Sequence, residues 1–179
     1  IVVLDYASLY PSSIIENNLS QDKYLSNDNP YLEKCRKDGT FEEKIEEIEY
    51  DDYRYEKRGN GDTVTKVKTG KTIKCYFLKD HRDEKGKIIK DNLGIVPTVL
   101  QTVLEARKET RKRIKTEPDE FKRKVLDGLQ LAYKVTANSV YGQLGAKTSG
   151  IFKMNLAACT TSVGRSRIYD ASRGVKEWA

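Results

Sequence analysis

The 179-residue sequence predicts an α+β fold in which a long antiparallel helical hairpin is joined to a part built from strands and shorter helices. Three observations predict this fold. Residues 1–6 form an apolar run typical of a buried strand, residues 20–92 alternate strand-like segments with turn signals, and the chain after residue 93 repeats apolar residues at the period of a helix. The elements are taken in chain order below.

The first 19 residues carry the strand and one helix. A turn follows the strand 1–6, and we expect a helix that enters at Pro11, because a proline in the first turn of a helix loses no hydrogen bond. The sequence does not begin with Met and opens inside the apolar run. From this opening we expect a piece of a longer polypeptide.

Residues 20–92 are expected to be an insertion of short strands and loops, built as short hairpins at the edge of the fold. They are rich in charge and are broken by turn signals, of which 59–62, Gly-Asn-Gly-Asp, is the clearest. An acidic run, 42–52, precedes a lysine-rich stretch, 63–79. Such blocks of charge are typical of solvated faces.

The helical hairpin is expected over residues 93–145. Thr116-Glu117-Pro118-Asp119 ends its first helix and provides the start signal of its second helix. Two long helices that are joined by so short a turn run antiparallel. A glycine-rich stretch then leads to a last helix in residues 146–179. The expected helices span 97–115, 120–141 and 156–178.

Composition excludes some classes of protein. Hydrophobic residues make up 37% of the chain and charged residues 34%, and no stretch approaches the ~20 apolar residues that span a bilayer. We therefore expect no membrane partner. The net charge of +6 suits a soluble enzyme or a nucleic-acid binder. The three cysteines lack the spacing of a zinc site, which favours reduced thiols and an intracellular setting.

The segment from Asp5 to Ser12, Asp-Tyr-Ala-Ser-Leu-Tyr-Pro-Ser, combines a carboxylate with a turn. Asp5 stands at the end of the predicted strand, where an oxygen ligand suits Mg²⁺. The amides of Ser8 and Leu9 lie where a turn enters a helix, which is a site for phosphate oxygens. The alternative is that Asp5 only forms the turn.

The second helix of the hairpin has two different faces at 100° per residue. Val125, Leu126, Leu129, Tyr133, Thr136 and Val140 fall on the apolar face. Asp127, Gln130, Lys134, Asn138 and Tyr141 fall close to a single line on the other. This polar line places a cation, an amide and an aromatic hydroxyl side by side, an arrangement that could hold a triphosphate and a base. A plain solvated face is the alternative.

The first helix of the hairpin continues an apolar stripe with two arginines, Arg107 and Arg111. The other members of the stripe are Leu100, Val103, Leu104 and Ile114. Either the arginines extend from the edge of a core, or they reach with Lys134 toward a common anion, because guanidinium groups suit phosphate. From 107 to 115 six basic residues accompany one acidic residue, which favours a phosphate-binding surface.

Two of these segments resemble family B DNA polymerases. Residues 5–12 are similar to the first motif of the palm, and residues 134–142, Lys-Val-Thr-Ala-Asn-Ser-Val-Tyr-Gly, are similar to the fingers motif. The resemblance extends through most of 1–20 and 93–179 and is greatest to the delta-like branch, which includes polymerases of large DNA viruses. Residues 20–92 match poorly.

The resemblance implies a palm and fingers fragment with a site for an incoming deoxynucleotide. Asp5 would bind two catalytic Mg²⁺ ions with the carbonyl of Tyr6, and the amides of Ser8 and Leu9 would hold the triphosphate. Tyr10 would pack under the sugar and exclude a 2′-hydroxyl. The remaining implied nucleotide-binding residues are Arg107, Arg111, Lys134 and Asn138 on the triphosphate, and Tyr141 and Gly142 under the nascent base pair.

The implied activity is template-directed addition of deoxynucleotides to a primer 3′-hydroxyl by two-metal phosphoryl transfer. The family's second palm motif, Tyr-Gly-Asp-Thr-Asp, is absent from the sequence, so we expect the chain to be inactive alone. Implied partners are primer-template DNA, deoxynucleoside triphosphates and a sliding clamp, in a nucleus or at a viral replication site. The alternative is a non-catalytic basic module that binds nucleic acid.

Overall fold

The computed structural model describes residues 6–58, 63–82, 88–89 and 92–178. The elements in chain order are α1 (Leu9–Glu16), the 3-10 helix η1 (Gln21–Lys23), β1 (Tyr24–Leu25), α2 (Pro30–Lys37), α3 (Phe41–Lys44), β2 (Ile45–Arg58), β3 (Thr63–Leu78), β4 (His81–Arg82), β5 (Ile88–Ile89), α4 (Ile95–Thr116), α5 (Glu120–Gly145) and α6 (Met154–Trp178). The fold is α+β, as predicted. Most of the expected strand 1–6, including Asp5, lies outside the described residues.

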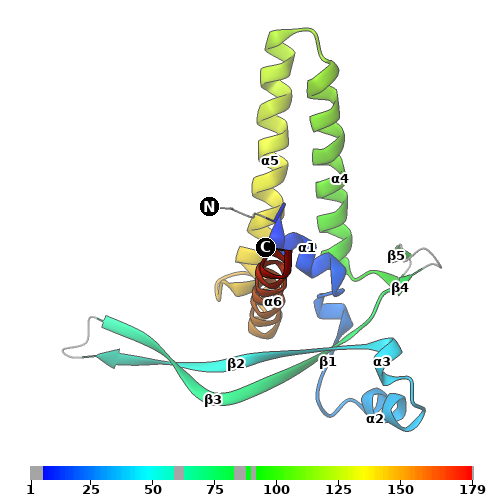
Figure 1. Ribbon diagram of the computed structural model, residues 1–179, viewed down its shortest axis with the longest axis vertical. Coiled ribbons are helices and arrows are strands. Elements are labelled where there is room, and N and C mark those ends of the chain that lie inside the picture. The colour runs from blue at the N-terminus through cyan, green and yellow to red at the C-terminus, as the bar shows by residue number, and fades with distance from the viewer. Residues whose placement is uncertain (1–5, 59–62, 83–87, 90–91, 179) are drawn as a thin grey trace.

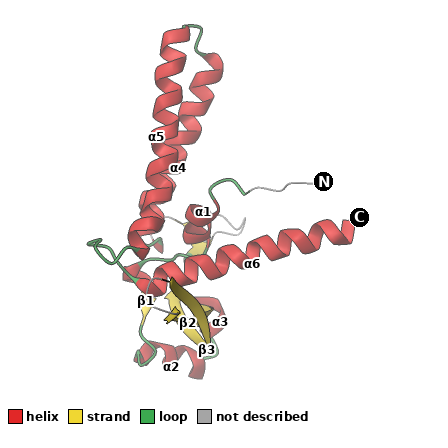
Figure 2. Ribbon diagram, turned by 90° about the vertical axis from the view of Figure 1, so that its left-hand side faces the viewer, coloured by secondary structure: helices red, strands yellow, loops and turns green. Residues whose placement is uncertain are grey.

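Helices α4 and α5 form the antiparallel hairpin and rise together from the rest of the molecule (Figure 1). The start signal between them is confirmed, because the carboxylate of Asp119 accepts hydrogen bonds from the amides of Phe121 (2.8 Å) and Lys122 (3.1 Å). Their observed bounds lie within a few residues of those expected. Helix α6 runs across the base of the hairpin, above the sheet (Figure 2).

The sheet differs from the expected short hairpins. Strands β2 and β3 are 14 and 16 residues long and form one antiparallel hairpin, and β1 pairs with β3 to complete the order β1-β3-β2. Charge pairs join the two strands: Lys68 lies 2.7 Å from Asp51, and Lys74 lies 2.7 Å from Glu47. The acidic run and the lysine-rich stretch are therefore the two strands of one hairpin.

The main core joins the base of the helical hairpin to α1, α6 and the sheet. Its fully buried side chains include Ile14 of α1, Phe77 of β3 and Leu100 of α4. The other members are Leu19, Ile48, Cys75, Ala137, Leu144, Leu156, Ala157 and Cys159. All three cysteines are buried free thiols. This core places α1 against α4, α5 and α6.

The packing face of α5 differs from the expected apolar face. Leu126, Ala137 and Leu144 are buried, whereas Val125 is 57% exposed and Leu129 is 39% exposed. The outer half of the helix packs on α4 alone, and a two-helix contact covers a narrow stripe of each helix. A broad apolar face cannot be covered by one partner.

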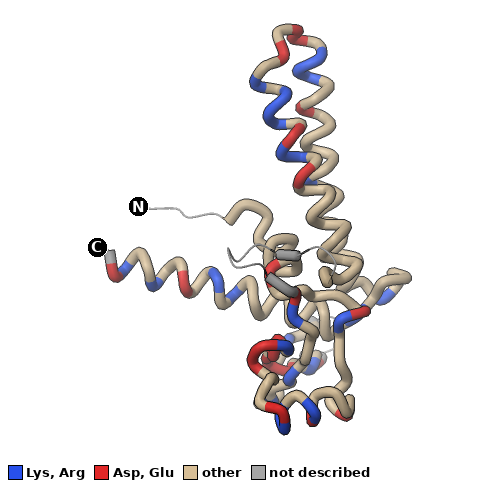
Figure 3. Tube along the Cα trace, turned by 90° about the vertical axis from the view of Figure 1, so that its right-hand side faces the viewer, with Lys and Arg blue, Asp and Glu red and all other residues tan. Residues whose placement is uncertain are grey.

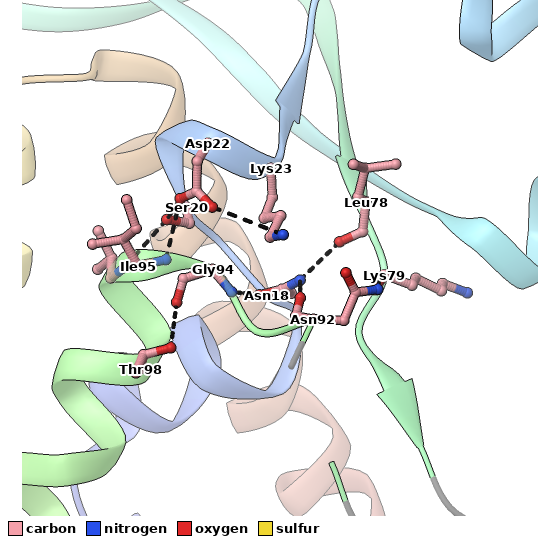
Figure 4. Close-up of polar contacts among 11 residues, drawn as sticks. Asn18, Ser20, Asp22, Lys23, Leu78, Lys79, Asn92, Gly94, Ile95 and Thr98 are labelled. Atoms are coloured by element: carbon pink, nitrogen blue, oxygen red, sulfur yellow. Dashed lines mark hydrogen bonds and ion pairs between the residues drawn. The ribbon is translucent and has the colours of Figure 1, made fainter. Parts of the chain in front are cut away.

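The start of α4 is held by residues that follow α1 (Figure 4). The buried side chain of Asn18 accepts a hydrogen bond from the amide of Gly94 (2.7 Å) and donates to the carbonyls of Leu78 (3.0 Å) and Asn92 (3.2 Å). This one side chain therefore ties the end of α1 to β3 and to α4.

Two residues of the η1 segment cap α4 from a distance. Asp22 accepts from the amide of Ile95 (3.2 Å), and the hydroxyl of Ser20 accepts from the amide of Val96 (3.2 Å) while donating to Asp22. Gly94 has no side chain with which to cap the helix itself. The first amides of α4 are thus satisfied by residues more than 70 positions earlier in the chain.

Candidate functional site

The turn before α1 is built around Ser8. Its backbone is left-handed, with φ 58° and ψ 54°, a conformation that costs a non-glycine residue about 1–3 kcal/mol. The carbonyl of Ser8 accepts from the amide of Ser12 (2.9 Å), but its side chain makes no capping hydrogen bond within the described residues. The first amides of α1 thus have no side-chain cap from Ser8. Their binding of an anion stays a prediction.

A pocket of about 450 Å³ lies between this turn and the outer half of α4. It is lined by Ala7, Ser8, Leu104, Arg107, Lys108, Arg111, Lys112 and Lys115. Figure 3 shows Lys and Arg spread along this part of the helical hairpin. The structure thus brings the Ser8 turn and the two predicted arginines to the same pocket, although they are about one hundred residues apart.

The charge of the pocket is strongly positive. Its described lining contains five basic side chains and no carboxylate. The nearby Glu109 accepts a hydrogen bond from Lys112 (2.7 Å), which holds the pKa of Glu109 below its usual range. Arg107 is half-buried, and its Nε donates to Gln130 of α5 (3.3 Å). Gln130, predicted on the polar line, therefore positions Arg107 and lies in the contact between the helices.

Tyr10 of α1 stacks on Tyr141 of α5, with ring centroids 4.3 Å apart and ring planes inclined by 23°. The hydroxyl of Tyr141 is 3.1 Å from that of Thr161 in α6. A Cβ at Gly164 would lie 3.1 Å from the ring of Tyr10, so the absence of a side chain there leaves room for the ring. Sequence reasoning assigned no role to Thr161 or Gly164, and residue type alone could not have singled out Gly164: Gly142 also lies inside a helix, and no atom lies within 4 Å of its Cβ position.

The structure does not bring the other predicted α5 residues into the pocket. Lys134 and Asn138 are exposed and do not line it. Gly142 is also exposed, and no atom lies within 4 Å of the position that a Cβ would take there. Leu9 lies at the first position of α1. The described walls of the pocket therefore come from the Ser8 turn and α4, and not from α5.

The described residues do not form a set of ligands for a divalent cation. No group of three or more His, Cys, Asp or Glu side chains is close enough together in the described part of the chain. Asp5, the predicted ligand, lies outside the described residues, and the hydroxyl of Tyr6 donates to the carbonyl of Arg167 (2.9 Å). Among the helices of the described residues, none has the length and hydropathy of a membrane-spanning segment.

Comparisons with known proteins agree with the predicted family. The family described as DNA polymerase family B matches residues 1–179. The chain is 34% identical to a DNA polymerase of Phaeocystis pouchetii virus and 33% identical to the DNA polymerase delta catalytic subunit of Schizosaccharomyces pombe, over 94% of its length in each case. It spans 17% and 12% of those two relatives.

The fold has a counterpart among solved structures. The family B DNA polymerase of the archaeon Pyrobaculum calidifontis matches 97% of this chain with a TM-score of 0.57 and 23% sequence identity, over 17% of that polymerase chain. The likeness covers the helical hairpin, the sheet and α6 together. The sequence relatives and the family match carry the assignment: the chain belongs to DNA polymerase family B.

Proposed function

We propose that this chain binds the incoming deoxynucleoside triphosphate in a DNA polymerase that extends a primer on a template. The meeting of the Ser8 turn with the cationic side of α4 in one pocket, beside the Tyr10–Tyr141 stack, carries this proposal. Such a reaction belongs where DNA is replicated, inside a cell. A sliding clamp stays a predicted partner.

The triphosphate would lie in the pocket. Arg107 and Arg111 would neutralise its oxygens from α4, while the amides of Ser8 and Leu9 would donate to them from the start of α1. Lys134 and Asn138 would reach the triphosphate only after the outer part of the hairpin moves toward α1. A lid that closes on its substrate in this way also excludes water.

The sugar and the base would lie at the stacked tyrosines. Tyr10 would pack beneath the deoxyribose and leave no space for a 2′-hydroxyl, and Tyr141 with Gly142 would support the nascent base pair. The contacts of Tyr10 with Tyr141 and with the backbone of α6 at Gly164 hold its ring in place. A fixed ring discriminates by shape better than a mobile one.

Magnesium would be held by Asp5 and the carbonyl of Tyr6 together with a carboxylate that this sequence does not contain. Two bound ions would stabilise negative charge on the attacking and leaving oxygens. Within this chain, Arg107 and Arg111 would stabilise the departing pyrophosphate, whose charge grows as the primer hydroxyl attacks the α-phosphate.

Binding of dATP by the purified chain tests the proposal, with titration calorimetry as the measurement. Arg107→Ala and Arg111→Ala should each weaken binding at least about tenfold, because a charge-assisted hydrogen bond contributes about 1.5–3 kcal/mol. Arg123→Ala, an exposed arginine of α5 outside the pocket, is the matched control. Unchanged dATP affinity in both pocket variants would refute the assignment.

The sugar role of Tyr10 has its own readout. Wild-type chain should bind dATP more tightly than ATP, and Tyr10→Ala should remove most of that preference. If the chain is a non-catalytic nucleic-acid-binding module, we expect a different pattern: neither dATP nor ATP binds the pocket, and only DNA does. That result would replace the polymerase proposal with the binding-module alternative.

A further inference from the structure

Besides the pocket beside the Ser8 turn, a groove lies between β2 and α6. The proposed function assigns no role to its lining residues. Its volume is about 210 Å³. The β2 wall and its neighbours contribute Tyr50, Asp51, Asp52, Tyr53, Tyr55 and Lys66, and α6 contributes Met154, Ala158, Thr161, Ser162 and Arg165. The two walls are held together, because the hydroxyl of Ser162 donates to the carbonyl of Glu49 (2.6 Å).

Three tyrosines of β2 line this groove, next to an irregularity in the strand pairing. Side chains alternate along a strand, so Tyr50 should face away from Tyr53 and Tyr55. The register of β2 with β3 shifts between Asp51 and Tyr53, and the additional residues of the shift lie in β3. Tyr53 and Tyr55 thus share a face of β2, while Tyr50 also packs against the main core. Irregularities of this kind re-aim side chains and are frequent near functional sites.

The irregularity in the strand pairing is stabilised by specific residues of β3. Asp51 pairs with Thr72 and Tyr53 with Lys68, so three residues of β3 stand opposite the single residue Asp52. Gly70, the middle one, has φ 79°, a backbone conformation that suits glycine. The hydroxyl of Thr69 donates to the carboxylate of Asp52 (2.9 Å), which fastens the two strands at this point.

Cations accompany the aromatic rings. The Nζ of Lys66 lies 4.1 Å from the centroid of the Tyr53 ring, and Arg165 lines the α6 side of the groove. The carboxylate of Asp51 is paired with Lys68 at 2.7 Å, which offsets its charge. Tyr55 is 70% exposed. Exposed aromatic rings beside basic side chains are the features with which proteins hold unpaired nucleotides.

One residue, Thr161, contacts both the groove and the stacked tyrosines of the proposed nucleotide site. Thr161 lines the groove, and its hydroxyl is 3.1 Å from that of Tyr141, which stacks on Tyr10. Thr161 therefore lies between the groove and Tyr141.

We propose that the groove between β2 and α6 binds an unpaired nucleotide of single-stranded DNA. The base stacks on Tyr55 beside Tyr53, and Lys66 and Arg165 contact the adjoining phosphates. Identifying this strand as the template rests on the proposed function. Binding of single-stranded DNA by the groove does not.

The test is fluorescence anisotropy of a fluorescein-labelled twelve-nucleotide oligothymidylate with the purified chain. Tyr55→Ala should weaken binding about fivefold or more, because loss of one base–aromatic stack has an effect of that size. Tyr55→Phe keeps the ring and should bind like wild type. Tyr169→Ala, which removes a 68% exposed tyrosine of α6 outside the groove, is the matched control.

An abasic oligomer of the same length separates stacking from charge. It keeps the phosphates, so Tyr55→Ala should not change its affinity, whereas Lys66→Ala should weaken both oligomers. Equal affinity of wild type and Tyr55→Ala for oligothymidylate would overturn the proposal, as would the absence of any binding to oligothymidylate.

Measuring dATP in the same variants keeps the two proposals apart. Tyr55→Ala should leave dATP affinity unchanged. If neither the wild type nor any variant binds dATP, but Tyr55→Ala still weakens binding of oligothymidylate, the proposed function is wrong and the proposal for the groove is supported. If dATP binds as expected and Tyr55→Ala retains the oligomer, the groove proposal fails alone.

Discussion

Gly94 is the residue at which the helical hairpin meets the segment that follows α1. A Cβ there would overlap the Cβ of Ser20 and lie 2.9 Å from its hydroxyl. Ser20 cannot withdraw easily, because its hydroxyl accepts from the amide of Val96. The close approach of two backbones at this point therefore requires glycine.

We expect Gly94→Ala to lower the free energy of unfolding by about 1–3 kcal/mol, as forced overpacking does. Urea denaturation followed by circular dichroism measures the change. Gly128→Ala in α5 is the control: no atom lies within 4 Å of its Cβ position, and alanine should stabilise that helix by about 0.5–1 kcal/mol. Stabilisation by both substitutions would contradict the packing described for Gly94.

Tyr50 has a pKa that burial raises to about 12. Its hydroxyl donates to the side-chain oxygen of Asn155 (3.0 Å), which a tyrosinate could not do. The unfolded chain releases this proton near pH 10, while the folded chain keeps it. The stability that comes from this group is therefore complete below pH 10 and is lost as the pH rises toward 12.

The corresponding prediction compares wild type with Tyr50→Phe. The variant should show a shallower loss of stability between about pH 10 and 12, and it should lack the latest-titrating component in tyrosine absorbance near 295 nm. Identical slopes in the two proteins would show that the folded pKa of Tyr50 is ordinary.

At the scale of elements, Asn18, Ser20 and Asp22 act as the cap of a helix that begins more than 70 residues later. Asn18 is fully buried and uses both ends of its amide. Removing it leaves the amide of Gly94 and two carbonyls without partners, and each buried unpaired group costs about 1–3 kcal/mol.

We therefore expect Asn18→Ala to destabilise the chain by about 3 kcal/mol and to speed amide hydrogen exchange at the first turn of α4 most of all. Exchange detected by mass spectrometry measures this local effect. Asn17→Ala is the matched control, because the side chain of Asn17 donates to the carbonyl of Ser13 in α1, and within the described residues it makes no hydrogen bond to α4. Uniform exchange rates along α4 in both variants would contradict the capping role.

The charges of β2 and β3 have a different consequence at this scale. Lys68 and Lys74 are paired with carboxylates of the facing strand, so they offer little free charge to DNA phosphates. Such exposed pairs each contribute at most about 1 kcal/mol, and together they set the register more than the stability. Of the hairpin's lysines, Lys66 lines the groove beside α6, together with the aromatic rings of β2.

At the scale of the whole molecule, the chain spans a small part of its polymerase relatives, 12% of the delta subunit of Schizosaccharomyces pombe. The described residues contain no set of divalent-cation ligands, and the second palm motif is absent from the sequence. The purified chain should therefore bind dATP yet extend no labelled primer in the presence of Mg²⁺, as measured by gel electrophoresis. Extension would disprove the requirement for a second carboxylate.

The sequence by itself determined the local elements and the family. The helical period and the Asp119 cap depend on neighbours within a turn or two, so α4, α5 and α6 could be predicted to within a few residues. The arginines of α4 and the Ser8 turn could also be chosen in advance, because their chemistry is carried by residue type and short spacing.

Only the tertiary structure decided which of these elements meet. The buried face of α5, the single long hairpin of β2 and β3, the Asn18 contacts and the three tyrosines in one groove each depend on residues far apart in the chain. A shift in strand register or a missing packing partner leaves no mark on local residue order. The free energy of such contacts arises only when distant segments pack together. A helical period or a short motif depends on neighbouring residues and therefore does not report it.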